Sequence, residues 1–288
     1  MQVYHRDTKQ LVQEEDVGGG AIRFTYGTAF GRMLAKGLLC RKFVSDLYGA
    51  WQKSPLSRRK VRRFMTRYKI RVDDCTEQDF PNFNAFFTRQ RKEYPHLCAG
   101  QELPAVADSR LTVLPIGTDT VFRIKGVPYT TAELLNDKAL AAAYAGGWCM
   151  IFRLAPDDYH RYVYPDDGSQ EASVHIPGVL HTVNPIAAEL AVYRRNTRCY
   201  TLLHTEHFGD VIEMEVGALL VGRIVNHRED AAAFSKLQEK GYFQYGGSTV
   251  ILLLKQGILI PDADLLKYSA QGIESRVHLG ERVGCAVT

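Results

Sequence analysis

The chain has 288 residues, of which 45% are hydrophobic and 24% charged, and its formal net charge is +4. These are ordinary globular values and exclude an intrinsically disordered chain. The six cysteines show no paired spacing, which favours reduced thiols in an intracellular protein over a zinc site or a disulfide framework. No apolar run approaches the roughly 20 residues of a membrane-spanning helix, so we expect any membrane contact to be peripheral.

The N-terminal third predicts a strand-like extension over residues 1–25 and a mainly helical region over residues 28–92. Lysines and arginines crowd the segment from Arg32 to Arg71, where apolar residues recur at helical spacing. A basic amphipathic pattern is typical of helices that lie on anionic lipid, and a core-packed helix with a solvated basic face explains it equally well. We rank nucleic-acid binding below both, because no recognition motif accompanies the charge.

From residue 104 onward, short β-branched segments are broken by Gly, Pro and Asp. They predict strands at 110–116, 121–124, 149–154, 160–164, 171–183, 200–205, 211–216, 219–226, 249–255 and 276–279. Helices are predicted at Thr131–Tyr144 and Asp230–Lys240. The expected fold is α+β, with a β-rich, antiparallel, sandwich-like core at residues 93–288 and a basic helical layer at residues 1–92.

The tetrapeptide Gly246-Gly247-Ser248-Thr249 is the most informative motif. Its two glycines allow backbone conformations that other residues rarely adopt, and an apolar run typical of a buried strand follows. A serine in such a loop can attack its own preceding carbonyl. Taken alone, the motif is typical of an ordinary turn.

Several segments together resemble the phosphatidylserine decarboxylase family. They occur in the expected order from Phe83 to Gly284: FNAFFTR (83–89), ADSRLTV (107–113), IKGVPYTTAELL (124–135), FRLAPDDYHRY (152–162), VGALLVGRI (216–224), GYFQYGGSTVILLLKQG (241–257) and LGERVG (279–284). The resemblance implies a proenzyme that cuts itself between Gly247 and Ser248 into residues 1–247 and 248–288. Ser248 would become a pyruvoyl group, the only cofactor expected. That group forms a Schiff base with the amine of phosphatidylserine, which is decarboxylated to phosphatidylethanolamine.

The resemblance also implies roles for a histidine and an aspartate. His160 is the candidate general acid, and Asp108, in Ala107-Asp108-Ser109, matches the aspartate that activates the serine together with a histidine. Family members commonly carry a second histidine where this chain has Val163. Either His160 serves both steps, or another histidine substitutes, of which His181 is the candidate, or cleavage is impaired.

The anionic headgroup of the substrate needs cationic partners. The candidates in matched motifs are Arg89, Lys125, Arg153 and Arg161, and each is equally well explained as a surface or ion-paired residue. No pattern indicates a metal. The expected partners are a phospholipid membrane surface on its cytoplasmic face, phosphatidylserine and the two self-associated chains, with a homo-oligomer left open.

Two other functions compete with this one. Val163 motivates a non-catalytic phospholipid-binding relative that is not processed. A serine hydrolase using Ser248, His160 and Asp108 is disfavoured, because the motif is not a Gly-x-Ser-x-Gly nucleophile elbow.

Overall fold

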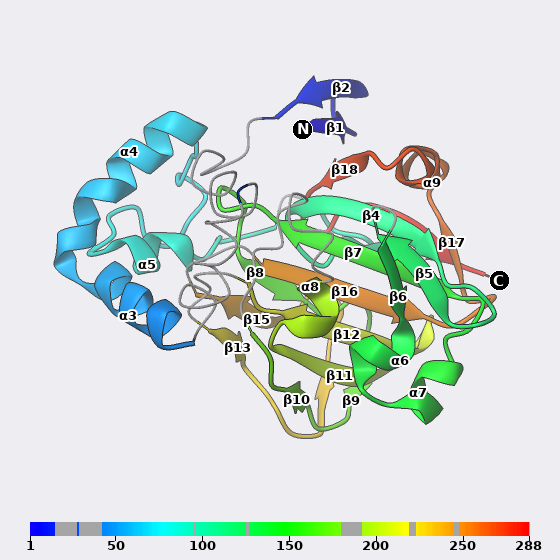
Figure 1. Ribbon diagram of the computed structural model, residues 1–288. Coiled ribbons are helices and arrows are strands. Elements are labelled where there is room, and N and C mark those ends of the chain that lie inside the picture. The colour runs from blue at the N-terminus through cyan, green and yellow to red at the C-terminus, as the bar shows by residue number, and fades with distance from the viewer. Residues whose placement is uncertain are drawn as a thin grey trace.

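A sheet of eleven strands runs through the centre of the protein (Figure 1). The computed structural model describes residues 1–14, 28, 42–94, 96–124, 127–179, 192–218, 223–244 and 248–287. Neighbouring strands of this main sheet are antiparallel, except that β1 and β18 run parallel. The strand order is β14 (Ala232–Phe234), β9 (Gly168–Gln170), β11 (Arg198–Thr205), β12 (Gly209–Val216), β16 (Ser248–Leu254), β7 (Trp148–Leu154), β4 (Ser109–Pro115), β18 (Glu274–Val277), β1 (Gln2–His5) and β2 (Gln10–Gln13), with β10 (Val174–Ile176) also paired to β11.

Strand β16 lies in the middle of the main sheet, between β12 and β7. All seven of its residues are buried, which explains why its sequence is a continuous apolar run after Ser248 and Thr249 and does not alternate with polar residues. The residue that ends the Gly-Gly-Ser motif is therefore the first residue of a fully buried central strand.

Smaller sheets complete the β structure. One consists of β13 (Ile224–Asn226), β15 (Glu239–Phe243) and β8 (Arg161–Val163), and its Tyr162 and Phe243 belong to the same hydrophobic core as β16. Another consists of β17 (Leu259–Pro261), β19 (Arg282–Ala286) and β3 (Glu102–Pro104), and β5 (Val121–Ile124) pairs with β6 (Val127–Thr130). The predicted α+β class with a strand-rich antiparallel core is confirmed.

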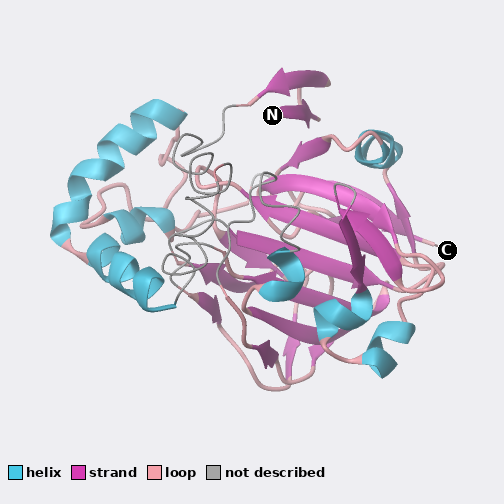
Figure 2. Cartoon of the chain, in the orientation of Figure 1, coloured by secondary structure: helices cyan, strands magenta, loops and turns pink. Residues whose placement is uncertain are grey.

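The helices lie around the strands (Figure 2). They are α3 (Lys42–Lys53), the 3-10 helix η2 (Pro55–Ser57), α4 (Arg58–Tyr68), α5 (Phe83–Phe87), α6 (Thr131–Leu135), α7 (Lys138–Ala142), α8 (Val192–Arg195) and α9 (Ala263–Ala270). Helices α3, α4 and α5 stand together at the end of the molecule opposite the C-terminus (Figure 1). Val61 of α4 packs there with four buried phenylalanines in a separate hydrophobic cluster.

The helix predicted at Asp230–Lys240 is wrong. Residues 232–234 form β14, which pairs with β9, and Glu239 already belongs to β15. Between them Leu237 has a left-handed φ of 62°, which ends any helix. The Ala- and Lys-rich composition favours a helix locally, but pairing with the sheet overrides that weak preference.

The helix predicted at Thr131–Tyr144 is two short helices. Asn136 ends α6 in the left-handed conformation, and the Asp137 side chain caps α7 by accepting from the amides of Ala139 and Leu140. The strand predicted at 171–183 is shorter, since β10 covers only Val174–Ile176. Most of residues 15–41, predicted as strand-like and then helical, lie outside the described residues.

Candidate active site

Ser248 is enclosed by the sheet. Its side chain is fully buried, and its backbone faces Leu154 of β7. Its Oγ has no hydrogen-bond partner among the described residues. The strand fixes the position of this residue, and no described group binds its hydroxyl. Gly247 lies outside the described residues.

His160, which directly precedes β8, is fully buried and uncharged. Its Nδ1 lies 3.0 Å from the carbonyl oxygen of Asp158, and because a carbonyl only accepts, Nδ1 carries the proton. The lone pair is then on Nε2, for which the described residues provide no partner. Burial lowers the pKa of His160 to about 3, so the ring is a neutral base at physiological pH.

A tight turn sets the position of that carbonyl. In Ala155-Pro156-Asp157-Asp158 the amide of Asp158 donates to the Ala155 carbonyl at 2.9 Å, and proline is favoured at the second position of such a turn. The Asp158 carboxylate accepts from the Ala155 amide at 2.7 Å and from Arg110 of β4. The ring of Phe87 packs on His160 with centroids 3.8 Å apart. The imidazole is therefore fixed by the turn and by α5.

Asp108 is buried and ionised. Its carboxylate accepts from Arg91 at 2.7 Å and from the amide of Leu279 at 2.8 Å, and His278 lies 4.0 Å away. Burial alone would raise the pKa of Asp108, but Arg91 and the Leu279 amide lower it below its ordinary value.

Ser248 and Asp108 lie at the same end of the main sheet. Strands β16 and β4 run in the same direction on either side of β7, and Arg153 of β7 faces Thr249 on one side and Arg110 on the other. At strand spacings of about 4.8 Å, the start of β16 and the start of β4 are roughly 10 Å apart. Among the described residues no hydrogen bond joins Ser248, His160 and Asp108, so a triad of the protease type is not assembled.

Val163 takes a packing role. It is fully buried on β8 in a small cluster with Tyr159 and Leu279. An apolar side chain there cannot transfer a proton. His181, the predicted substitute, lies outside the described residues.

The side chains predicted to bind the headgroup differ in whether their hydrogen-bond donors already have partners within the protein. Arg153 is buried and binds Glu274 at 2.6 and 3.0 Å. Arg161 binds Glu239 at 2.5 Å and the backbone oxygens of Thr88 and Arg89. Both side chains hold elements of the fold together.

Arg89 differs from these two. Within the described part of the chain it donates to the carbonyl oxygens of Phe86 at 3.3 Å and Asp158 at 3.4 Å, and no carboxylate there pairs with it. Burial lowers the pKa of Arg89. The fourth candidate, Lys125, lies outside the described residues.

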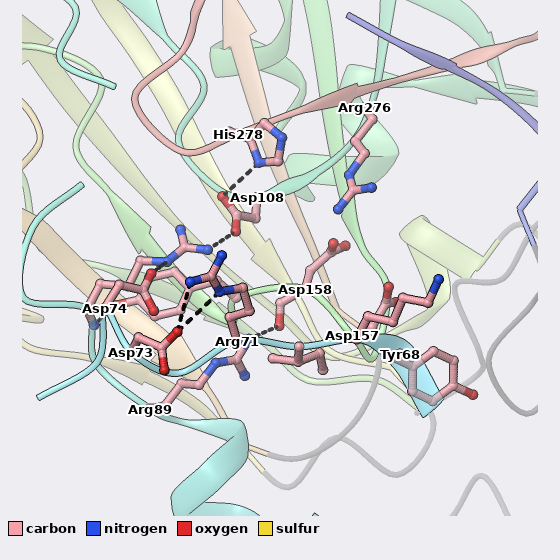
Figure 3. Close-up of a pocket in the computed structure, with 14 residues that line it drawn as sticks. Tyr68, Arg71, Asp73, Asp74, Arg89, Asp108, Asp157, Asp158, Arg276 and His278 are labelled. Atoms are coloured by element: carbon pink, nitrogen blue, oxygen red, sulfur yellow. Dashed lines mark hydrogen bonds and ion pairs between the residues drawn. The ribbon is translucent and has the colours of Figure 1, made fainter. Parts of the chain in front are cut away.

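A cavity of about 510 Å³ lies beside Asp108, between residues 68–74, which comprise the last residue of α4 and the segment after it, and the turn before His160. Arg89, Arg276 and His278 contribute to its wall, and Figure 3 shows His278 pointing toward Asp108. Neither Ser248 nor His160 lines it. The side chains of Ser248 and His160 are therefore enclosed, and the polar cavity reaches only their neighbours Asp108 and Asp158.

Sequence reasoning assigned no role to four residues of this region: Arg91, Arg110, Asp158 and His278. Arg110 and Asp158 stand inside the quoted motifs, two residues from Asp108 and from His160, and that proximity was the available signal. Arg91 and His278 lie just outside the quoted motifs, and nothing in the sequence indicated a role for them.

The described residues lack two features that a protein of this size can carry, a membrane-spanning helix and a cluster of metal ligands. No helix there is both long enough and apolar enough to cross a bilayer. No group of three or more His, Cys, Asp or Glu side chains there is arranged to hold a metal ion.

The fold is that of an α+β protein, and its core holds a buried serine after two glycines, a neutral buried imidazole and an ionised buried carboxylate. Residues 83–285 match the family model described as phosphatidylserine decarboxylase. The chain belongs to this family.

Similar proteins align with nearly the whole chain. Phosphatidylserine decarboxylase proenzyme 2 of Clostridium acetobutylicum is 41% identical over 285 residues, which are 98% of this chain and 97% of the relative. The phosphatidylserine decarboxylase proenzyme of Clostridium botulinum (strain Kyoto / Type A2) is 36% identical over 295 residues, 98% of each chain. That of Ruminiclostridium cellulolyticum is 36% identical over 291 residues, 99% of this chain and 97% of the relative.

Proposed function

We propose that this chain cuts itself between Gly247 and Ser248 and then decarboxylates phosphatidylserine to phosphatidylethanolamine with the pyruvoyl group so formed. Family membership supports the reaction. The observation that carries the self-cleavage is the buried Ser248 Oγ, which stands without a partner among the described residues directly after two glycines. Leaving a buried hydroxyl unpaired costs about 1–3 kcal/mol. Ser109 and Ser275 are also buried with an Oγ that has no described partner, and Ser248 differs from them in following two glycines.

The cleavage uses atoms of this chain and water. Ser248 Oγ attacks the carbonyl carbon of Gly247 while its proton passes to a base, the peptide C–N bond breaks as its nitrogen takes up a proton, and an ester forms. Removal of the α-proton of residue 248 then breaks the Cβ–O bond and releases the Gly247 carboxylate. The dehydroalanine left behind takes up water and loses ammonia. The products are residues 1–247 and a pyruvoyl-capped 248–288.

His160 is the proposed base. Its Nε2 carries a lone pair, and the turn before β8 fixes the ring orientation. With Val163 unable to accept a proton, His160 serves in both the cleavage and the later protonation of the substrate carbon. Its lowered pKa makes the protonated imidazole, a minor form at pH 7, a strong acid. Burial, Arg89 and Arg110 disfavour that form, and the Asp158 carbonyl and Asp108 offset them only in part.

The pyruvoyl carbonyl supplies an electron sink when CO2 leaves the substrate. Ser248 fits as its source, because the residue begins a strand held on both sides by β12 and β7. Arg89 is the proposed partner of the anionic headgroup, since it lines the cavity and no described carboxylate pairs with it.

The N-terminal helices are the proposed membrane contact. Leu47 and Trp51 of α3 and Leu56 of η2 are 62%, 40% and 78% exposed. Arginines of α4 line an adjacent groove of about 780 Å³. Exposed apolar side chains beside arginines suit peripheral binding to an anionic lipid surface, which we assign to the cytoplasmic face.

The direct test compares two serine variants on phosphatidylserine vesicles. Wild-type protein is expected to release CO2 and form phosphatidylethanolamine, whereas Ser248→Ala stays one chain and forms none. Ser275→Ala is the matched control, because Ser275 of β18 is also buried with an Oγ that has no described partner. Product formation by Ser248→Ala would refute the proposal, and an intact, inactive wild-type chain that still binds vesicles would favour the unprocessed lipid-binding relative.

A further inference from the structure

Three ionisable side chains lie in the space between the main sheet and the sheet that contains β15. Glu213 and Glu215 come from β12 and Lys240 from β15, and all three are fully buried. Lys240 Nζ lies 2.6 Å from Glu215 Oε1 and 3.8 Å from Glu213 Oε2. Removing charges from water costs several kcal/mol per ion, so such a cluster in a hydrophobic core calls for a reason beyond stability.

The cluster behaves as one ion pair with a neutral neighbour. Burial raises the pKa of Glu213 to about 8, so this side chain is mainly a neutral acid at pH 7. Its oxygens have no hydrogen-bond partner among the described residues. Glu215 is bound to Lys240 and also accepts from Asn226 at 3.3 Å. Burial alone would lower the pKa of Lys240, but the two carboxylates raise it, which keeps the ammonium charged.

A β-bulge turns Lys240 toward this space. The pairing of β15 with β8 shifts register between Glu239 and Gly241, so Lys240 is an extra residue on β15. Its neighbour Glu239 instead binds Arg161 and His227. Bulges of this kind re-aim a single side chain, here into the core.

The ion pair joins β15, which precedes the scissile peptide, to β12, the sheet neighbour of β16, which follows that peptide. Strand β15 ends at Phe243, five residues before Ser248. Strand β12 pairs with β16, and Glu215 faces Val250, which shares a sheet face with Ser248. The Lys240–Glu215 bond therefore connects the strand that enters the scissile segment to the neighbour of the strand that leaves it.

We propose that Lys240 is a positioning residue for the self-cleavage, which fixes the end of β15 relative to the start of β16 through its ion pair with Glu215. This inference rests on the proposed self-cleavage. A misplacement of reacting atoms by about 1 Å can lower a rate on the order of 100-fold, so small movements of β15 matter. After the cut, β15 is no longer covalently joined to residue 248, and the pair loses its influence on the reactive end.

The test uses variants that avoid an unpaired buried charge. Lys240→Met alone would leave Glu215 buried without its ion-pair partner. The informative variant is therefore Lys240→Met/Glu215→Gln, in which both charges are removed. Glu213→Gln is the matched control, since it changes a neutral member of the same cluster that lies farther from Lys240. Each chain is made by cell-free translation, and its cleavage is followed with time on denaturing gels, with resistance to protease as the measure of folding.

The double variant is expected to be protease-resistant and to cleave about 10- to 100-fold more slowly than wild type, in line with the cost of small misplacements. The fraction that does mature is expected to keep wild-type kcat and KM per pyruvoyl group, which a general structural defect would not allow. Glu213→Gln is expected to cleave at the wild-type rate.

Wild-type cleavage by the double variant, equal slowing by Glu213→Gln, or a protease-sensitive double variant would each overturn the inference. If wild type itself does not cleave, the proposed function fails, and this inference fails with it.

Discussion

The imidazole of His160 owes its protonation state to two local features. The carbonyl of Asp158 accepts a hydrogen bond from Nδ1–H, and burial against Phe87 keeps the ring uncharged. The sequence identified this histidine through its motif. It did not reveal the tautomer, because the partner is a backbone oxygen whose position depends on the turn that Asp158 and Arg110 hold.

The buried neutral state of His160 predicts a loss of stability in acid. The folded pKa is about 3, whereas the unfolded chain titrates near its ordinary value of about 6.5. Between these values the unfolded state binds the extra proton, so stability falls as the pH falls, by about 2 kcal/mol from pH 7 to pH 5. Denaturant unfolding of Ser248→Ala, which remains one chain, measures this loss.

The control for that experiment is Ser248→Ala/His160→Gln. It lacks the titrating group, and its loss of stability between pH 7 and pH 5 is expected to be smaller by about 2 kcal/mol. Equal losses in the two proteins would show that His160 is not buried in the neutral state.

Arg89 carries the second prediction at the scale of single residues. Replacing it with Gln is expected to raise KM for phosphatidylserine about tenfold or more and to change kcat less, since a hydrogen bond to a charged group contributes about 1.5–3 kcal/mol. Arg71→Gln is the control, because Arg71 lines the same cavity but is exposed and paired with Asp73. Steady-state kinetics on mixed micelles decide the matter, and an unchanged KM in Arg89→Gln would exclude a role in headgroup binding.

Among the elements, η2 and α3 carry the prediction for membrane contact. Leu56→Ser is expected to weaken binding to anionic vesicles about tenfold, because insertion of a leucine contributes about 1.5–3 kcal/mol. Leu97→Ser is a matched control, since Leu97 is 76% exposed but lies outside these helices. Vesicle sedimentation measures both variants, and equal weakening by the two would argue against docking through the helices.

Elements were predictable where local pattern and tertiary pairing agree. The strands at 149–154 and 249–255 have long apolar runs, and the structure places β7 and β16 there to within one residue. The helix prediction for residues 230–240 was wrong because alanines and lysines favour a helix locally, whereas the strands that pair with this segment, β9 and β8, are distant in sequence. Long-range pairing of this kind leaves no signal within a short window.

At the scale of the whole molecule, the proposed cut would not separate the two fragments. Strand β16 is hydrogen-bonded on both sides to strands of residues 1–247, and all of its residues are buried. We therefore predict that residues 1–247 and 248–288 elute together in size-exclusion chromatography and part only in denaturant. Elution of the small fragment on its own under native conditions would contradict this arrangement.

The arrangement of the site was only partly predictable from the sequence. Motif order placed Ser248, His160 and Asp108 on the candidate list, and the sheet brings Asp108 to the same end as Ser248. The sequence did not predict the ion pairs around these residues. Arg91 pairs with Asp108 and Arg110 pairs with Asp158, and both pairs depend on contacts between segments far apart in the chain. The buried Lys240–Glu215 pair was missed for the same reason.

The mass of the purified protein under denaturing conditions decides whether the chain cuts itself before Ser248 and forms a pyruvoyl group. We expect two species, residues 1–247 with a free carboxyl end and residues 248–288 lighter by one ammonia than a fragment that begins with serine. We also expect the small fragment to resist N-terminal sequencing. A single species with the mass of all 288 residues, or a small fragment that begins with an unmodified Ser248, would contradict this expectation.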